Sequence, residues 1–312
     1  MFADTLYSSI KSSKSVVVAG FDPRLEAIPE FILKESFSKN RSEEDSLNDA
    51  LFNFHKIALE SLTGKIAAIK PNLAFFEQYG IAGVRAFASI CDLAHDMSLP
   101  VIVDGKRGDI GTTAVAYSNA YLGKSIVNNH KKSFFSCDAL TVNPFLGFDT
   151  LEIFLKDCIE YGKGIFILAQ TSNPGAKALQ GLVDKSSNKT LSFIIAEWIY
   201  KNGSALKGKS GFSGLGAVVG ATYPEQAAEL RNIMKDNLFL VPGYGAQGGT
   251  AKDLLPNFDA RGAGAIINIS RALLSSFSSL TITESMMREE INQKISGFNN
   301  DINSTLSSAG QS

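Results

Sequence analysis

The sequence has little cysteine or histidine, almost no excess charge and no long hydrophobic run. Its 312 residues include three cysteines, three histidines, and 30 basic against 31 acidic side chains, for a formal net charge of −1. A nearly neutral chain lacks the overall basic charge of most nucleic-acid-binding proteins and of polybasic membrane anchors. No apolar run approaches the roughly 18 residues that are needed to cross a bilayer. We therefore expect no nucleic-acid partner and no membrane segment.

The few cysteines and histidines exclude further classes of protein. Cys91, Cys137 and Cys158 are odd in number, widely spaced and without a CxxC pair, which predicts reduced thiols in or near the core. No histidine has the spacing of a zinc site such as HExxH, and the chain has no GxSxG elbow, so neither a metal site nor a serine hydrolase is expected. The N-terminal segment lacks the basic start and apolar core of a secretory signal, which favours a cytoplasmic protein.

What the sequence does contain is a series of short runs rich in Val, Ile, Leu and Phe. They do not alternate strictly between apolar and polar residues, which is typical of parallel strands buried on both faces. Segments with apolar residues three and four positions apart lie between them, for example 47–62 and 81–97, and predict helices. The runs comprise residues 16–22, 66–72, 100–106, 139–144, 164–171, 215–221, 238–243 and 265–270.

Eight buried strands that alternate with amphipathic helices predict a single-domain (β/α)₈ TIM barrel. The alternative is an open, doubly wound sheet with a similar number of strands, and the absence of a GxGxxG turn after the first strand weighs against it. The polar stretch 34–48 is expected to be a solvated insertion, and 201–214 a surface loop. The tail 296–312 is rich in Ser and Asn, and we expect it to be flexible.

The segment VIVDGKRGDIGTTA (101–114) carries the strongest candidate chemistry, because barrel active sites lie at the carboxyl ends of strands. Asp104 and Lys106 are two residues apart and therefore point to the same side of a strand, and Asp109 follows in the loop. A buried lysine tends to lose its proton, but two flanking carboxylates keep Lys106 protonated, so that it can act as a general acid. Lys70, on the neighbouring strand, can pair with Asp104. The alternative is a ring of salt bridges that only closes the barrel.

Two further segments follow predicted strands and indicate a phosphate and a lid. PGYGAQGG (242–249) offers backbone amides, and Arg271 stands at the start of the helix after the last strand, so that both can bind an anion. The alternative is a plain tight turn and a surface arginine. In QTSNPGA (170–176), Pro and Gly predict a turn, and the stretch that follows it to residue 190 is long enough to form a lid. The alternative is a plain loop, which this segment favours when it is considered alone.

Together these motifs resemble those of the orotidine 5′-phosphate decarboxylase family, in its longer-chain bacterial branch (type 2). The resemblance extends from GFDPR (20–24) to NISRALL (268–274). DGKRGDIGTTA is similar to the DxKxxD signature of that family, and TSNPGA and PGYGAQGG resemble its uracil-side and phosphate-side loops. DxKxxD alone also occurs in related sugar-phosphate decarboxylases and synthases, and the combination with Lys70 and TSNPGA makes the resemblance specific.

The resemblance implies that orotidine 5′-monophosphate loses CO₂ to give uridine 5′-monophosphate in de novo pyrimidine biosynthesis, without a metal, flavin or pyridoxal cofactor. It implies an alternating array in which Lys106 protonates the C6 carbanion, within a homodimer where Asp109 and Thr113 reach the partner's site. The array would comprise Lys70, Asp104, Lys106 and Asp109. The implied substrate contacts are Asp22 and Thr113 for the ribose, Ser172 for the pyrimidine, and Gln247 and Arg271 for the phosphate.

Three other functions compete with this interpretation. The nearest is a related sugar-phosphate decarboxylase or aldolase, such as a hexulose phosphate synthase, which uses magnesium and an acidic residue where this chain has Lys70. A phosphate-binding isomerase on the same fold is the second, and it would need a glutamate or histidine base near the strand ends. The third is an inactive, ligand-binding barrel, against which the costly retention of a full set of buried charges argues.

Overall fold

The computed structural model describes residues 1–312 except 39, 246–247, 275–276, 278–281 and 312. Eight parallel strands form one sheet in the order β2-β1-β10-β9-β8-β7-β6-β3. The two end strands approach each other through parallel bridges between Ile69 and Val101 and between Asn72 and Asp104. The strands are β1 (Val17–Phe21), β2 (Ala68–Pro71), β3 (Ile102–Arg107), β6 (Ala139–Val142), β7 (Gly164–Gln170), β8 (Ser213–Val219), β9 (Asn237–Val241) and β10 (Ala265–Ile269).

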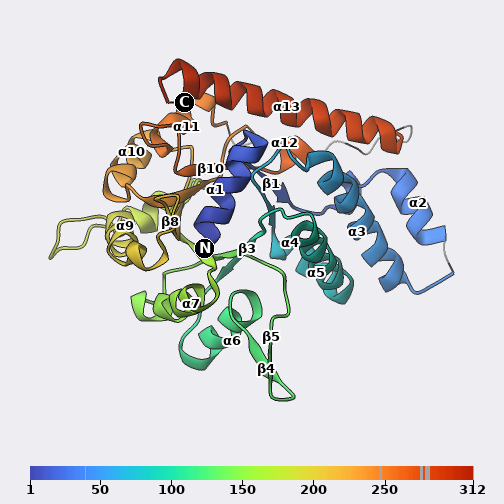
Figure 1. Ribbon diagram of the computed structural model, residues 1–312, viewed down its shortest axis with the longest axis horizontal. Coiled ribbons are helices and arrows are strands. Elements are labelled where there is room, and N and C mark those ends of the chain that lie inside the picture. The colour runs from blue at the N-terminus through green and yellow to red at the C-terminus, as the bar shows by residue number, and fades with distance from the viewer. Residues whose placement is uncertain (39, 246–247, 275–276, 278–281, 312) are drawn as a thin grey trace.

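The sheet is therefore a nearly closed barrel, and the predicted TIM-barrel fold is confirmed. Each predicted apolar run overlaps one of the barrel strands, and the open doubly wound sheet is excluded. Helices surround the barrel, as Figure 1 shows. They include α3 (Glu43–Leu62), α4 (Leu73–Glu77), α5 (Gly80–Asp96), α6 (Gly111–Tyr121), α7 (Phe148–Tyr161), α8 (Ala176–Gln180), α9 (Leu191–Asn202), α10 (Pro224–Ile233), α11 (Ala251–Leu254) and α12 (Arg271–Leu274).

Alternate residues of the strands face two different apolar layers. In β1, Val17 and Ala19 belong to the large core between the sheet and the helices, whereas Val18 belongs to a smaller core inside the barrel. The inner core is covered by the N-terminal helix α1 (Phe2–Ser13), which lies across the middle of the ring of helices in Figure 1. Phe2 packs edge-to-face on Phe166 of β7, with ring centroids 6.0 Å apart. Helix α1 thus closes the amino end of the barrel and leaves the opposite end for the site.

The structure corrects the expectation of a flexible C-terminal tail. Residues 296–308 belong to the helix α13 (Glu284–Ser308), which packs along one side of the barrel. Ile302 and Leu306 are four residues apart and both are buried, so the polar composition of the tail describes only the exposed face of this helix.

The two polar segments expected as an insertion and a loop are also partly regular. Residues 34–48 cover the end of α2 (Glu30–Ser38) and the start of α3, where the hydroxyl of Ser42 accepts the backbone N–H of Asp45 at 3.1 Å. Residues 201–214 contain a 3₁₀ turn, η2 (Gly203–Leu206), and the start of β8.

One hairpin lies outside the strands that the sequence predicted. β4 (Ser125–Val127) and β5 (His130–Lys132) pair antiparallel, and the two Asn residues between them have positive φ angles of 49° and 63°. An Asn-Asn pair with positive φ is a turn signal for a two-residue hairpin, and this signal was available in the sequence.

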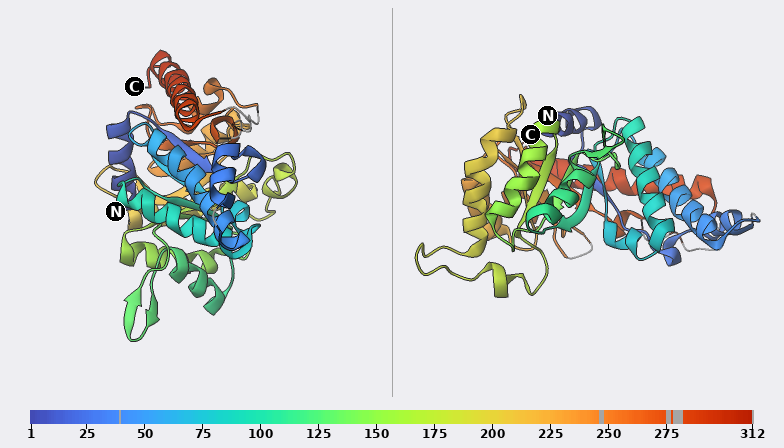
Figure 2. Two further views of the ribbon diagram at one scale, coloured as in Figure 1. Left: turned by 90° about the vertical axis from the view of Figure 1, so that its right-hand side faces the viewer. Right: turned by 90° about the horizontal axis from the view of Figure 1, so that it is seen from below.

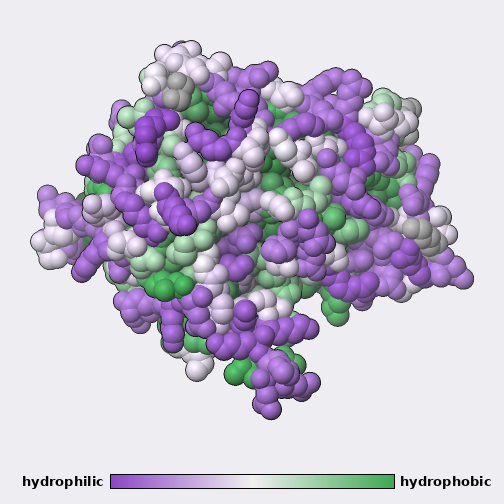
Figure 3. Space-filling model, in the orientation of Figure 1, coloured by the Kyte–Doolittle hydropathy of each residue, from purple (hydrophilic) through white to green (hydrophobic). Residues whose placement is uncertain are grey.

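The surface shown in Figure 3, in the same view as Figure 1, is mostly hydrophilic, with hydrophobic areas that are small and separate. Among the described residues, none of the helices combines the length and the apolar character that a membrane crossing requires.

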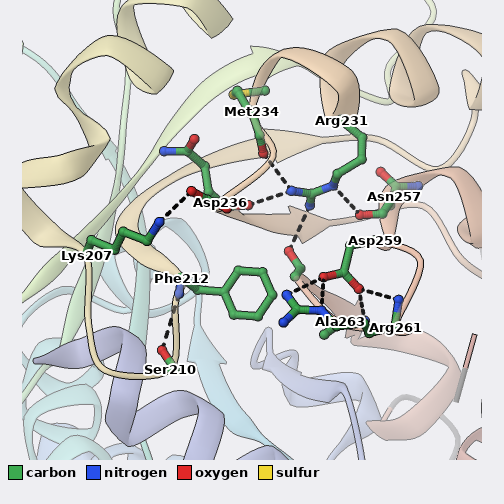
Figure 4. Close-up of polar contacts among 12 residues, drawn as sticks. Lys207, Ser210, Phe212, Arg231, Met234, Asp236, Asn257, Asp259, Arg261 and Ala263 are labelled. Atoms are coloured by element: carbon green, nitrogen blue, oxygen red, sulfur yellow. Dashed lines mark hydrogen bonds and ion pairs between the residues drawn. The ribbon is translucent and has the colours of Figure 1, made fainter.

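A buried arginine stabilises the amino end of the barrel (Figure 4). Arg231 of α10 is only 7% exposed, and its guanidinium lies 3.6 Å from the ring centroid of Phe239. Burial lowers the pKa of Arg231 to about 9, although Asp259 and Asp236 act in the opposite direction. The guanidinium donates to four backbone carbonyls at 2.8–3.0 Å, those of Met234, Asn237, Asn257 and Gly264. It therefore fixes the segments that lead into β9 and β10.

We expect the substitution Arg231→Lys to lower the free energy of unfolding by about 2–4 kcal/mol, because one ammonium group cannot reach four carbonyls in a fork and leaves several of them unpaired. Urea denaturation measures the change. The matched control is Arg261→Lys, whose side chain is 71% exposed in its ion pair with Asp259 and should cost less than about 1 kcal/mol. If both substitutions lowered the free energy of unfolding equally, the hydrogen bonds of the buried Arg231 guanidinium would not be important for stability.

Candidate active site

A cavity of about 830 Å³ opens at the carboxyl ends of the strands. In the right-hand view of Figure 2, α1 lies at one end of the barrel and the segment after β7 projects at the other. Predicted site residues from four strands line this cavity, so the structure brings together distant parts of the sequence. They are Asp22, Lys70, Asp104, Lys106 and Ser172.

The centre of the site is a carboxylate held between two lysines. The Nζ atom of Lys70 donates to Oδ2 of Asp104 at 2.6 Å, and the Nζ atom of Lys106 donates to Oδ1 at 2.6 Å. Asp104 and Lys70 are buried, at 8% and 6% exposure. Burial alone would raise the pKa of Asp104, but the charges and hydrogen bonds of the two lysines hold it well below its usual value. Asp104 is therefore ionised at neutral pH.

Thr141 of β6 completes this cluster, and sequence reasoning missed it. Its hydroxyl donates to Oδ1 of Asp104 at 3.0 Å and accepts the backbone N–H of Lys106 at 2.9 Å. The only signal in the sequence is the place of Thr141 in an otherwise apolar strand, where a threonine also suits β structure. Thr141 orients the carboxylate and also the backbone of the lysine beside it.

Lys106 differs from expectation in two respects. Its side chain is 51% exposed rather than buried, and the backbone has a φ angle of 46°, in the left-handed region that non-glycine residues seldom adopt. The pairing of β3 with β6 shifts register between Val103 and Arg107, so a bulge directs Lys106 toward the cavity. Among the residues that the structure describes, one carboxylate, not two, contacts Lys106. The carboxylate of Asp109 instead accepts the backbone N–H of Ile110 at 2.8 Å.

Asp22 follows β1 and also lines the cavity. The hydroxyl of Ser270, at the end of β10, donates to its Oδ2 atom. Asn268 of β10 also lines the cavity, although it was not among the predicted site residues. Strands β1 and β10 are neighbours in the sheet, which explains why residues 248 positions apart meet.

The segment after β7 is fastened to the barrel by side-chain hydrogen bonds. Gln180, in α8, donates to the hydroxyl of Thr171 at 2.8 Å and accepts the backbone N–H of Thr171 at 2.9 Å. Ser172 lies against Gly220, where an added Cβ atom would come within 2.8 Å of the Ser172 Cβ. The close approach of β8 thus sets the position of Ser172 at the cavity wall.

The remaining predicted contacts do not line this cavity. Asp109 and Thr113 lie in and just before α6, outside the wall, and Thr113 is exposed. Arg271 begins α12 and lines a separate, smaller cavity beside Asp22. Gln247 lies outside the described residues. The part of the chain that the structure describes contains no group of three His, Cys, Asp or Glu placed to hold a metal ion.

Part of the cavity wall is apolar, and the sequence motifs gave no indication of it. Such a wall lowers the local dielectric, which strengthens interactions among the charged groups. It is formed by residues that follow β6, by α8 and by the first turn of α9, among them Phe145, Phe148, Leu179, Leu191, Ile194 and Ile195.

The fold and the site together define a (β/α)₈-barrel enzyme with a lysine–carboxylate–lysine cluster at the carboxyl end of its strands. The model of the family described as "Orotidine 5′-phosphate decarboxylase / HUMPS family" matches residues 54–280. The chain belongs to the orotidine 5′-phosphate decarboxylase family.

Individual relatives agree with this assignment. The chain is 41% identical to the orotidine 5′-phosphate decarboxylase of Caldicellulosiruptor bescii over 276 residues, which cover 88% of this chain and 90% of the relative. It is 43% identical to that of Rhodopirellula baltica, covering 88% of each chain. The structure of Leishmania donovani OMP decarboxylase superposes with a TM-score of 0.71 at 28% identity, over 97% of this chain and 98% of the other.

Proposed function

We propose that this chain converts orotidine 5′-monophosphate to uridine 5′-monophosphate and CO₂, as a step of de novo pyrimidine biosynthesis. The observation that carries the proposal is the Lys70–Asp104–Lys106 cluster at the wall of the cavity. Family membership supports the choice of substrate.

The cluster suits a decarboxylation that leaves negative charge on carbon. With the substrate carboxylate beside Asp104, two like charges about 4 Å apart repel by roughly 4 kcal/mol at an effective dielectric near 20. The repulsion is relieved as the C6–carboxylate bond breaks. The electron pair of that bond stays on C6, next to the ammonium group of Lys106, and Lys106 then transfers a proton to C6.

The most similar alternative is a magnesium-dependent sugar-phosphate decarboxylase or aldolase of the same family. A cation at this site would compete with the two ammonium groups that already occupy both oxygens of Asp104. This arrangement favours orotidine 5′-monophosphate as the substrate.

The deciding experiment follows the ultraviolet absorbance of orotidine 5′-monophosphate after addition of purified protein with excess chelator. We expect a change to the spectrum of uridine 5′-monophosphate. No change with orotidine 5′-monophosphate, together with magnesium-dependent turnover of a hexulose or keto-gulonate phosphate, would overturn the proposal.

We further propose a homodimer with two shared active sites. Asp109 and Thr113 lie outside the cavity of their own chain, at the start of α6. Near them in the chain are apolar side chains with high exposure, Ile110 at 61% and Val115 at 43%. A second copy packed on this face would cover these side chains and bring Asp109 and Thr113 to the other cavity.

The phosphate of the substrate is proposed to bind at Arg271 and at the glycine-rich segment 242–249, including Gln247. We expect Arg271→Ala to weaken the binding of uridine 5′-monophosphate by about 30- to 100-fold, since a charge-assisted contact is lost, and to leave the binding of uridine nearly unchanged. Isothermal titration calorimetry with both ligands measures the difference, with the exposed Arg261→Ala as the control. An unchanged affinity for uridine 5′-monophosphate would remove Arg271 from the phosphate site.

A further inference from the structure

A second, much smaller cavity adjoins the active site behind Asp22. Its volume of about 10 Å³ corresponds to the space for a single water molecule. Asp22 lines both cavities and therefore separates them. The other charged or titratable groups in the wall of the small cavity are Arg24, His55 and Arg271.

His55 of α3 is enclosed by aromatic rings on its other sides. The ring centroids of Phe21, Phe54 and Phe76 lie 4.9, 5.0 and 5.5 Å from that of His55. The Nδ1 atom lies 2.7 Å from the carbonyl oxygen of Leu51, and because a carbonyl can only accept, Nδ1 carries the proton. Burial lowers the pKa of His55 to about 4, so the ring is neutral at neutral pH and its Nε2 atom is an acceptor.

Three buried polar atoms of the residues around this cavity have no hydrogen-bond partner among the described residues. They are Nε2 of His55, Oδ1 of Asp22 and Nε of Arg24. The first two are acceptors and the third is a donor. Buried polar groups are almost always satisfied, and polar groups too far apart for a direct bond are commonly bridged by water. One water molecule can donate two hydrogen bonds and accept one, which matches two acceptor atoms and one donor atom.

We propose that the small cavity binds one ordered water molecule, which accepts from Nε of Arg24 and donates to Nε2 of His55 and Oδ1 of Asp22. Oδ2 of Asp22 is already held by the hydroxyl of Ser270, so the water fixes the second oxygen and with it the plane of the carboxylate. His55 is thereby a positioning residue for Asp22, which it reaches through the water. This positioning role rests on the proposed function, in which Asp22 contacts the ribose, whereas the water site does not.

The water site is tested on the wild-type protein without any assay of activity. A crystal structure at high resolution is expected to show one water within hydrogen-bond distance of all three atoms. Nitrogen-15 NMR of labelled histidine is expected to show His55 as the Nδ1–H tautomer with a hydrogen-bonded Nε2. A cavity without water density, or a direct contact between Arg24 and Asp22 that fills it, would overturn the proposal.

The positioning role is tested by a mutant cycle. His55→Asn keeps a donor for the Leu51 carbonyl but removes the acceptor at Nε2. It is expected to raise KM for orotidine 5′-monophosphate about tenfold, with kcat changed less than about threefold. The same change made in an Asp22→Ala background is expected to have almost no further effect, because the two residues act through one contact.

Two more variants complete the cycle. His55→Gln can place an amide oxygen near the position of Nε2, so we expect it to recover most of the affinity for orotidine 5′-monophosphate. This variant therefore tests the role of His55 even if His55→Asn folds poorly. The exposed His95→Asn is the control and should change neither parameter. Equal losses in the presence and absence of Asp22 would refute the positioning role. Wild-type protein that leaves orotidine 5′-monophosphate unchanged would refute the proposed function and the role of Asp22 with it, while the crystal structure still decides the water site.

Discussion

Lys106→Ala is expected to reduce the turnover of orotidine 5′-monophosphate by at least about 10³-fold, while the binding of uridine 5′-monophosphate stays within about tenfold of wild type. A general acid alone contributes about 10²–10⁴-fold, and the ammonium group also stabilises the carbanion before it donates. The product has neither the carboxylate nor the developing charge, so its affinity depends mainly on contacts elsewhere in the cavity. Stopped-flow or steady-state absorbance and calorimetry measure the two quantities.

The fold should tolerate this substitution. Without Lys106, the carboxylate of Asp104 keeps its hydrogen bonds from Lys70 and Thr141. The Lys106 side chain is about half-exposed, so its removal leaves no large cavity. The matched control is Lys201→Ala, an exposed lysine of α9 that should leave turnover unchanged. Turnover of the Lys106→Ala variant close to wild type would eliminate this residue as the general acid.

The barrel could be predicted from the sequence because its strands are buried on both faces. A strand such as β1 is buried at every position, and it contains no polar side chain that would obscure the pattern. The helices α1 and α13 were not predicted, since their apolar residues are few and widely spaced in polar segments. Phe2 and Leu6, or Ile302 and Leu306, become recognisable only as pairs on one helix face.

The charged cluster could be predicted in part, for a reason that lies in strand geometry. The spacing of two residues between Asp104 and Lys106, together with Lys70 on the next strand, indicated that the three would meet, and they do. The role of Thr141 depends on the register between β3 and β6, and the backbone of Lys106 depends on a bulge in that pairing. Neither register nor bulges can be inferred from one strand at a time.

Mixing two inactive variants, Asp109→Ala and Lys106→Ala, is expected to restore activity. Neither homodimer would contain a complete site, since one lacks the general acid and the other lacks the carboxylate supplied by the partner. In a mixed dimer one of the two sites combines the intact Lys106 of one subunit with the intact Asp109 of the other. Random exchange of equal amounts should therefore return about a quarter of the wild-type sites. Activity is followed after the subunits have been dissociated in mild denaturant and refolded together.

The arrangement of residues around α6 is the reason for expecting this recovery. In its own chain, the Asp109 carboxylate bonds to the backbone of Ile110 and lies outside the cavity wall, whereas Lys106 lines the cavity and contacts Asp104. A site confined to one chain would therefore lack the second carboxylate. The control is a mixture of Lys106→Ala with Asp104→Ala, because both residues belong to the same chain's cluster and no mixed dimer can rebuild it. If exchange is verified by differently tagged subunits and the Asp109 mixture remains as inactive as this control, each chain must form its site alone.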